Sequence, residues 1–259
     1  MGNLHSILQK IVERKKSEVN TLYMSGKAAQ YRRSAAQSQS NFYDAISKAG
    51  LNLIAEIKRK SPSAGYIRRN ADPAIIAKIY QDSGASAISV LTDSDFDGEL
   101  SHLLSVSKEV YLPVLRKEFI IDKAQIYEAR FHQADSILLI VSLLEQSIVR
   151  EYLHLSRELG MECLVECHDE NELEKAINSG ARILGINNRN LHDDSVDINT
   201  TLRLLPYIPE GYVAVTESGI STYEDVKRFL HTKINAMLVG GPLMNALDIK
   251  KKVYELLGK

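Results

Sequence analysis

Short apolar segments of strand character recur eight times along this chain, and longer stretches of helical character separate them. The intervening stretches place apolar residues at positions i, i+3 and i+4, whereas the short segments are uniformly apolar or alternate. This succession is typical of repeated βαβ units and therefore of a parallel sheet. The predicted strands are residues 51–58, 86–93, 111–119, 135–144, 161–168, 182–188, 212–218 and 235–241.

Several of the predicted helices have recognisable ends. They include residues 73–84, 123–134, 146–159, 171–180 and 222–232. The predicted N-caps are Asp72 before Pro73, Asp122, Asp169 and Ser221. The segments QDSGASAISV and INSGARILGI form a weak internal repeat, in which a glycine ends a helix in the left-handed conformation before the next strand.

Eight such units predict an α/β fold of the (β/α)8 TIM-barrel type. An open doubly wound sheet usually has five or six strands and would leave two unassigned, and no glycine-rich dinucleotide fingerprint follows any strand. Residues 1–48 lie outside the repeat and predict a charged helix, a polar QSQSN break and a short second helix that cover one end of the barrel. We therefore expect a single domain over 1–259, with an N-terminal helical extension (1–48), a barrel (49–259) and IKKKVYELL as its last helix.

Composition and charge exclude several classes of function. A formal net charge of -1 provides no field for binding nucleic acid or an anionic membrane. No apolar run is long enough for a signal peptide or a membrane span, so we expect a cytoplasmic protein. Met1, Gly2 and Ser6 fit an N-myristoylation motif, but no second anchor accompanies them, and we expect no membrane attachment. Cys163 and Cys167 lie on one side of a strand and are predicted to be buried and reduced.

Charged residues stand at the carboxyl ends of the first and third predicted strands, where active sites of barrels are found. Strand alternation puts Glu56 and Lys58 on one face, with Ala55 and Ile57 on the other. The alternative is a plain buried ion pair. Lys117 is placed where a second ammonium could approach Lys58, and two close cations would lower the pKa of both lysines. Alone, Lys117 could equally be a solvated strand end.

The fifth and sixth strands end in further polar residues. Glu166 lies opposite the cysteines and should point inward, although it could merely cap or pair with a neighbour. Asn187 offers an amide and Arg189 a planar guanidinium suited to a carboxylate or phosphate, although an Asn-rich segment is also typical of a turn. His168 beside Cys167 suggests a metal, but no other close His or Cys completes a ligand set, so we expect no metal.

Glycines follow the seventh and eighth strands, in ESGIS and LVGGPLM. Barrels commonly build a phosphate site there from backbone N–H groups and the start of a short helix. Either motif alone could simply be a turn. Their occurrence after both strands favours a phosphate-binding enzyme.

The motifs AEIKRKSPSAGYIR, DPAIIAKIYQDSGASAISVLTD, PVLRKEFI, LVECHDE, GINNRNL, ESGIS and LVGGPLM resemble, in order and spacing, those of the indole-3-glycerol-phosphate synthases. The similarity runs from about residue 50 to residue 247, and the helical extension is also typical of that family. The resemblance implies a tryptophan-pathway lyase that cyclises, decarboxylates and dehydrates 1-(2-carboxyphenylamino)-1-deoxyribulose 5-phosphate. It implies no cofactor and no partner besides this small-molecule substrate, and we expect a monomer.

The resemblance also implies roles for individual residues. Lys117 would be the general acid, Glu166 would stabilise positive charge on the substrate, and Glu56 and Lys58 would serve the dehydration. The implied catalytic set is Glu56, Lys58, Lys117, Glu166, Asn187 and Ser218. The implied substrate-binding set is Ser61, Phe119, Arg189, Gly219, Leu238, Gly240 and Gly241, with Phe119 beside the aromatic ring and Ser218 joining the glycines at the phosphate.

The chain departs from the family pattern at three points. Glu118 replaces the usual Asp of Lys-Asp-Phe, the loop FDGEL is one residue short, and Gly241 replaces a Ser or Glu. The shorter loop puts its part in covering the substrate in question. Two rival functions stay open: another phosphate-binding barrel enzyme, such as phosphoribosylanthranilate isomerase or a Schiff-base aldolase, and a catalytically silent barrel that acts as a binding subunit.

Overall fold

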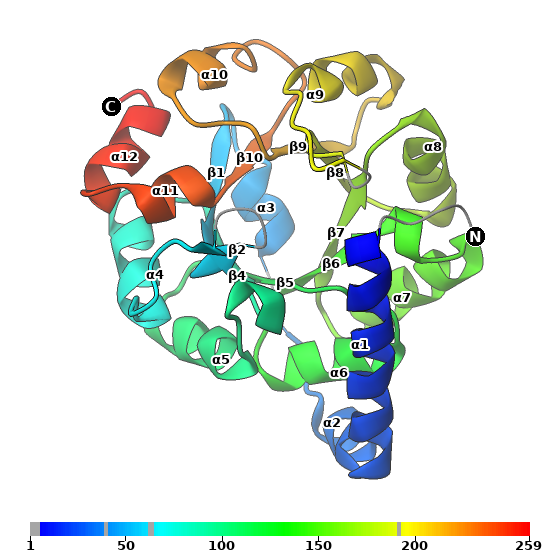
Figure 1. The fold of residues 1–259 in the computed structure, drawn as a ribbon. Helices are drawn as coiled ribbons and strands as arrows, with labels where there is room; N and C mark the ends of the chain where they lie inside the picture. Colours follow the sequence, from blue (N-terminus) through cyan, green and yellow to red (C-terminus); the bar gives the residue numbers. More distant parts are fainter. Residues whose placement is uncertain (1–5, 39–40, 62–64, 191–192) are drawn as a thin grey trace.

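The computed structural model describes residues 6–38, 41–61, 65–190 and 193–259, and it confirms the predicted barrel (Figure 1). Eight parallel strands close on themselves in the order β1-β10-β9-β8-β7-β6-β5-β4. The strands are β1 (Asn52–Ile57), β4 (Ala87–Leu91), β5 (Val114–Lys117), β6 (Ser136–Ile140), β7 (Glu162–Cys167), β8 (Ile183–Asn187), β9 (Val213–Glu217) and β10 (Ala236–Val239). A small antiparallel pair, β2 (Lys60–Ser61) and β3 (Gly65–Tyr66), follows β1.

Helices alternate with the strands and surround the barrel (Figure 1). The outer helices are α4 (Pro73–Asp82), α5 (Leu100–Glu109), α6 (Lys123–Phe131), α7 (Gln146–Glu158), α8 (Glu170–Ser179), α9 (Asn199–Leu204), α10 (Tyr223–Lys227) and α12 (Ile249–Leu256). Short helical segments lie in the connections: η1 (Ser94–Phe96), η2 (Val141–Leu143), η3 (Leu205–Tyr207) and α11 (Gly241–Asn245).

The element boundaries correct several predictions. Each strand is shorter than expected; the third begins only at Val114 because Pro113 has no N–H for a strand ladder. The predicted helix 222–232 ends at Lys227, where bonds to the third residue back replace the α-helical pattern. Its N-cap is Thr222 and not Ser221: Thr222 and Asp225 form a capping box, and Ser221 donates its N–H to Asp225.

The other caps and the internal repeat are confirmed. Asp72, Asp122 and Asp169 each accept a backbone hydrogen bond at the start of the following helix. Gly84 and Gly180 both have positive φ, at 99° and 89°, as the repeat predicted.

The N-terminal extension forms three helices: α1 (Ser6–Met24), α2 (Lys27–Ser34) and α3 (Phe42–Ile46). The expected first helix is split at Gly26, whose φ is 75°, and residues 1–5 and 39–40, the latter within the predicted QSQSN break, lie outside the described residues. Helix α3 covers the amino end of the barrel, where Phe42 and Ile46 are fully buried. In contrast, α1 runs along the outside and reaches the opposite end, which the sequence did not predict (Figure 1).

Two apolar layers hold the barrel together. Inward-facing strand residues fill its interior with the α3 side chains, and outward-facing residues pack against the helix ring. Leu164 belongs to the inner layer, whereas Cys163, Val165 and Cys167 belong to the outer one, so the predicted alternation on β7 is confirmed. Both cysteines are buried and free. Among the described residues, no helix has the length and apolar character needed to span a bilayer.

Gly160, which follows α7, lies against Ser38 of the N-terminal extension, and this close approach gives a test of the fold. Its φ is 71°, and a Cβ there would lie 2.3 Å from the carbonyl oxygen of Ser38. We predict that Gly160→Ala lowers the free energy of unfolding by about 3 kcal/mol, because left-handed strain of about 1–2 kcal/mol adds to the clash. Gly211→Ala is the matched control, since Gly211 has a φ of 89° but no atom within 4 Å of a built Cβ. Equal losses in chemical denaturation of the two variants would contradict the close approach of Ser38.

Candidate active site

A cavity of about 470 Å³ opens at the carboxyl ends of the strands. All eight barrel strands, or the residues directly after them, contribute to its wall. The floor is apolar and includes Leu138, Ile140 and Leu238, of which Leu238 was predicted to contact substrate. The charged side chains of the lining are Glu56, Lys58, Lys117, Glu118, Glu166, Arg189 and Glu217. The structure therefore brings the predicted charged residues together in one cavity.

Lys117 lies at the centre of this group. Its Nζ is 2.9 Å from Glu166 Oε2 and 3.3 Å from Glu217 Oε2. Burial acts to lower the pKa of Lys117, but the charges of Glu166, Glu217 and Glu56 outweigh it and raise the pKa above the usual lysine value. The prediction that Lys58 would lower the pKa of Lys117 is wrong, because carboxylates surround the ammonium. Lys117 is therefore charged at neutral pH.

Glu166 is held as an anion. Burial acts to raise its pKa, but Lys117 and His168 outweigh it and keep the pKa well below the usual range. The Asn187 amide donates to Glu166 Oε1 at 3.1 Å, which fixes the orientation of the carboxylate. Of the alternatives for Glu166, pairing with neighbours is therefore present, with Lys117 and His168 as the partners, and Glu166 and Lys117 both line the cavity.

Glu217 was missed as a candidate and lies in the same cluster. Its side chain is 2% exposed, and its Oε1 has no hydrogen-bond partner among the described residues. Burial is the main cause that raises the pKa of Glu217 to about 8, with Lys117 opposing and Glu166 adding to it. The alternation of Val213 and Val215 into the barrel interior could have revealed that Glu217 also points inward.

Glu56 and Lys58 lie on one face of the first strand and its end, as predicted. Lys58 Nζ is 3.1 Å from Glu56 Oε1. Both side chains line the cavity, Glu56 as a buried group that is 6% exposed and Lys58 as a partly exposed one at 20%. A Cβ at Gly240 would lie 2.2 Å from Glu56 Oε1, although the φ of Gly240 is an ordinary -125°. Glycine at this position therefore makes room for the Glu56 carboxylate.

The predicted phosphate motifs lie on the β9 and β10 side of the cavity. Ser218 and Gly219 line it and have successive positive φ values of 65° and 85°. Gly240 and Gly241 also line it, and the short helix α11 begins at Gly241. Successive backbone N–H groups in such turns, together with a short extra helix after the eighth strand, are a frequent anion-binding arrangement in barrels.

An aromatic wall lies on the β4 and β5 side. Phe119 follows β5 as predicted, and Phe96 at the end of η1 is a second ring that the sequence did not single out. The two ring centroids are 6.4 Å apart. Both rings line the cavity, which therefore has an apolar aromatic wall on this side.

Two predicted binding residues are less central. Arg189 lines the cavity but is 38% exposed and pairs with Asp194 at 2.9 Å. Ser61 lies on β2 and is not among the described lining residues. Residues 62–64 of the SPSAG turn and Leu191 of GINNRNL lie outside the described residues.

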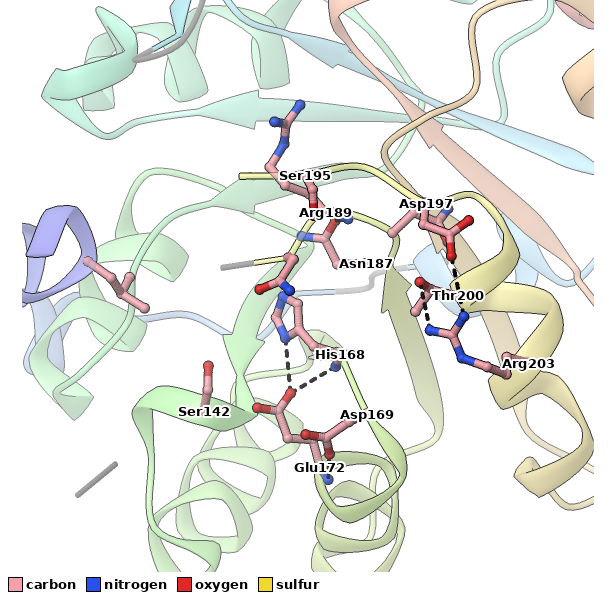
Figure 2. A pocket seen from close by; sticks show the side chains of 13 residues that line it. Ser142, His168, Asp169, Glu172, Asn187, Arg189, Ser195, Asp197, Thr200 and Arg203 are labelled. Carbon is pink, nitrogen blue, oxygen red and sulfur yellow. Dashed lines mark hydrogen bonds and ion pairs between the residues drawn. The ribbon is translucent and has the colours of Figure 1, made fainter. Parts of the chain in front are cut away.

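A second pocket of about 410 Å³ shares Asn187 and Arg189 with the cavity (Figure 2). His168 lies in its wall, where Nδ1 and the backbone N–H both contact Glu172 Oε2, at 2.9 and 2.8 Å. Burial acts to lower the pKa of His168, but Glu166 and Glu172 raise it to about 10. His168 thus faces two carboxylates as an imidazolium. Within the described ranges, no group of three His, Cys, Asp or Glu residues is arranged to hold a metal ion.

This arrangement supports acid and electrostatic catalysis on a phosphorylated aromatic substrate. A buried ammonium can protonate an oxygen, an adjacent anion can stabilise a developing cation, and a carboxyl group with a pKa of about 8 can exchange a proton near neutral pH. The aromatic wall offers a surface suited to the ring of such a molecule, and the glycine-rich wall offers backbone N–H groups suited to its phosphate.

Comparisons with known proteins agree with this chemistry. The family model described as Indole-3-glycerol phosphate synthase matches residues 8–256. Proteins of that name from Acetivibrio thermocellus and Chlorobium phaeovibrioides are 43% and 45% identical, over 96% and 94% of this chain and 98% and 96% of their own. Among solved structures, the tryptophan synthase alpha-subunit of Pyrococcus furiosus is similar in fold, with a TM-score of 0.61 and 17% identity over 80% of this chain and 98% of that one.

The raised pKa of Glu217 predicts a stability difference that depends on pH. Between the unfolded value of 4.5 and about 8, the folded chain holds a proton that the unfolded chain has lost, so folding stability falls as pH rises. Glu217→Gln does not titrate, and its free energy of unfolding should gain on that of the wild type by about 1 kcal/mol per pH unit from pH 5 to 8. Denaturation series at several pH values measure this difference, with Glu210→Gln as the exposed control. Parallel profiles for wild type and Glu217→Gln would show that Glu217 titrates normally.

Proposed function

The chain belongs to the indole-3-glycerol phosphate synthase family, and from this premise we propose how its cavity performs the reaction. The enzyme converts 1-(2-carboxyphenylamino)-1-deoxyribulose 5-phosphate to indole-3-glycerol phosphate, carbon dioxide and water. The observation that carries the assignment of residues is the Lys117 ammonium between Glu166 and Glu217 at the centre of the cavity.

Ring closure is the first step. The ring carbon that bears the carboxylate attacks the sugar carbonyl carbon, and the carbonyl oxygen gains negative charge as the C–C bond forms. Lys117 donates its proton to this oxygen and converts it to a hydroxyl group. Because its carboxylate neighbours keep Lys117 charged, the acid is fully protonated before the substrate reacts.

The attack leaves positive charge on the ring and its nitrogen. Glu166 is held as an anion by Lys117 and His168, and it stabilises this cation before carbon dioxide leaves. The electron pair of the broken C–C bond then restores the aromatic ring. Asn187 contributes by holding the Glu166 carboxylate in one orientation.

Dehydration completes the reaction. The hydroxyl group leaves as water after taking a proton, and the neighbouring carbon loses a proton to form the indole double bond. The Glu56 and Lys58 pair borders the cavity on β1 and serves this step: the Lys58 ammonium donates the proton to the leaving hydroxyl, and the Glu56 carboxylate takes the proton from the neighbouring carbon. Glu217 exchanges protons with Lys117, 3.3 Å away, and so restores the acid for the next cycle.

The substrate spans the cavity from one wall to the other. Its anthranilate ring lies at the aromatic wall of Phe96 and Phe119. The Arg189 guanidinium, which suits a carboxylate, pairs with the carboxylate of this ring. Its phosphate lies at the turn of Ser218 and Gly219 and at Gly241. This orientation places the sugar carbonyl over the central lysine.

The rival functions fit the cavity less well. A Schiff-base aldolase needs a neutral lysine amine, whereas the carboxylates around Lys117 hold it as an ammonium. A silent barrel would have no need for three buried carboxylates around a cation, which are costly to desolvate. A monomeric state, a cytoplasmic location and the absence of nucleic-acid partners stay predictions.

Replacing Lys117 tests the assignment of the acid. We predict that Lys117→Met lowers kcat by about 10² to 10⁴ while KM changes by less than about tenfold, because the lost group acts mainly in the transition state. Indole-glycerol fluorescence after addition of the substrate reports turnover. Lys78→Met on the exposed face of α4 is the control. More than about a third of wild-type turnover in Lys117→Met would remove Lys117 from the mechanism.

The two glycines after β10 should affect different kinetic constants. A methyl group in Gly240→Ala would displace the Glu56 carboxylate and should lower kcat by at least about tenfold. A built Cβ at Gly241 meets no atom within 4 Å, so Gly241→Ala adds its methyl group beside the proposed phosphate position and should mainly raise KM. Steady-state kinetics of both purified variants separate these effects. The same pattern in both would refute the assignment of Gly240 to Glu56 and of Gly241 to phosphate.

A further inference from the structure

A buried charge cluster, formed by Lys15, Asp93 and Glu118, lies behind the aromatic wall and has no part in the chemistry above. Lys15 Nζ is 2.8 Å from Asp93 Oδ2, 2.9 Å from Glu118 Oε1 and 2.8 Å from Glu18 Oε2. The side chains of Lys15, Asp93 and Glu118 are at most 3% exposed. One ammonium of α1 thus joins the segments that follow β4 and β5.

The Asp93 side of the cluster holds Phe96. Asp93 Oδ1 accepts the backbone N–H of Asp95 at 2.9 Å and so caps η1, which ends at Phe96. Arg14 contacts the same turn: its Nη2 lies 2.9 Å from Asp93 Oδ2 and 2.9 Å from Asp95 Oδ2. Its Nη1 donates to Ser94 Oγ at 3.0 Å. Two successive residues of α1 therefore fix the turn that presents Phe96 to the cavity.

The Glu118 side of the cluster holds Phe119. Glu118 Oε1, the oxygen that pairs with Lys15, accepts the backbone N–H of Phe119 at 2.8 Å. Its Oε2 accepts from Thr92 Oγ1 at 2.7 Å and lies 3.6 Å from Arg116 Nη2. Glu118 also stands next to Lys117 in the chain. The Glu118 carboxylate thus fixes the backbone between Lys117, the proposed acid, and Phe119, the ring that follows β5.

We propose that Lys15, assisted by Arg14, is a positioning residue that sets the two rings of the aromatic wall for the anthranilate end of the substrate. The inference rests on the proposed function and extends the site to helix α1. Lys15 does not itself line the cavity, and it acts through Asp93 and through Glu118, which does.

The cost of burying unpaired charges favours one fixed position for the segments that carry the two rings of the aromatic wall. A buried carboxylate is costly unless it is paired, and Lys15 is the cation that Asp93 and Glu118 share. Arg14 also pairs with Asp93, and Arg116 with Glu118. Burial acts to lower the pKa of Lys15, but Glu118 and Asp93 raise it, and the pairing persists across the neutral range. In the closed strand order β9 stands opposite β5, and the ion pairs of Lys15 within the described residues join it to its own helix and to the segments that follow β4 and β5, so the phosphate side of the cavity should not respond.

The test measures the affinity for the anthranilate ring separately from the affinity for phosphate. The variants are Lys15→Met, Lys15→Arg, Arg14→Met and the control Lys16→Met, whose lysine is 60% exposed and pairs with Glu13. For each, kcat and KM are measured with the substrate, together with inhibition constants for anthranilate and for inorganic phosphate and the melting temperature. Direct titration of anthranilate fluorescence gives the ring affinity without turnover.

We expect Lys15→Met to weaken anthranilate binding and raise KM by about tenfold, with kcat and the phosphate inhibition constant within about twofold of wild type. Arg14→Met should show the same split to a smaller degree, Lys15→Arg should recover part of the loss, and Lys16→Met should match the wild type. Equal loss of ring and phosphate affinity, or unchanged ring affinity in the folded variants, would overturn the proposal.

The proposal stays testable if Lys15→Met does not fold or if the wild type does not convert the substrate. If Lys15→Met does not fold, Arg14→Met decides, because Arg14 is 28% exposed and its removal leaves Lys15 to pair with Asp93. If the wild type does not convert the substrate, the proposed function fails, while anthranilate titration of wild type against Lys15→Met still tests the ring position.

Discussion

The pairing of charges inside the barrel mouth is the constraint on which the site depends. The charged side chains that line this cavity with an apolar floor include Glu56, Lys58, Lys117, Glu166 and Glu217, and each would be costly to bury alone. Their mutual contacts make the arrangement stable and also set the protonation states: Lys117 and Glu166 charged, Glu217 poised near neutral pH. The same interactions therefore account for both the stability and the reactivity of the site.

Much of this could be predicted from the sequence because strand alternation is local. The eight strands, the inward direction of Glu56, Lys58 and Glu166, and the glycines after the last two strands all follow from spacing and from the rule that barrel active sites lie at carboxyl strand ends. Glu217 obeys the same alternation, although the glycine of the TESGIS segment by itself indicates only a phosphate turn. Element boundaries were less predictable, since they depend on single bonds such as the Thr222 capping box.

What could not be predicted depends on contacts between segments far apart in the chain. The direction of the Lys117 pKa shift requires the positions of carboxylates on three other strands, and sequence reasoning that placed it beside Lys58 gave the opposite sign. The steric role of Gly240 likewise depends on Glu56, which lies on the neighbouring strand β1. The reach of Lys15 to Glu118 joins the extension to β5, and no periodicity within either segment indicates it.

The two ends of the cavity are built by different physical means, and the difference suits the phosphate and the aromatic ring that we propose they bind. A phosphate carries its own charge and can be held by backbone N–H groups, whose positions the strands and turns already fix. An aromatic ring offers little directional bonding, so its affinity depends on where the flat side chains of the wall stand. Phe96 and Phe119 lie in the connections that follow β4 and β5 and not on the strands themselves, so strand pairing alone does not set their spacing. The N-terminal helix ties these two connections together through one buried ammonium, which explains why an extension beyond the eight-fold repeat reaches the catalytic end of the fold.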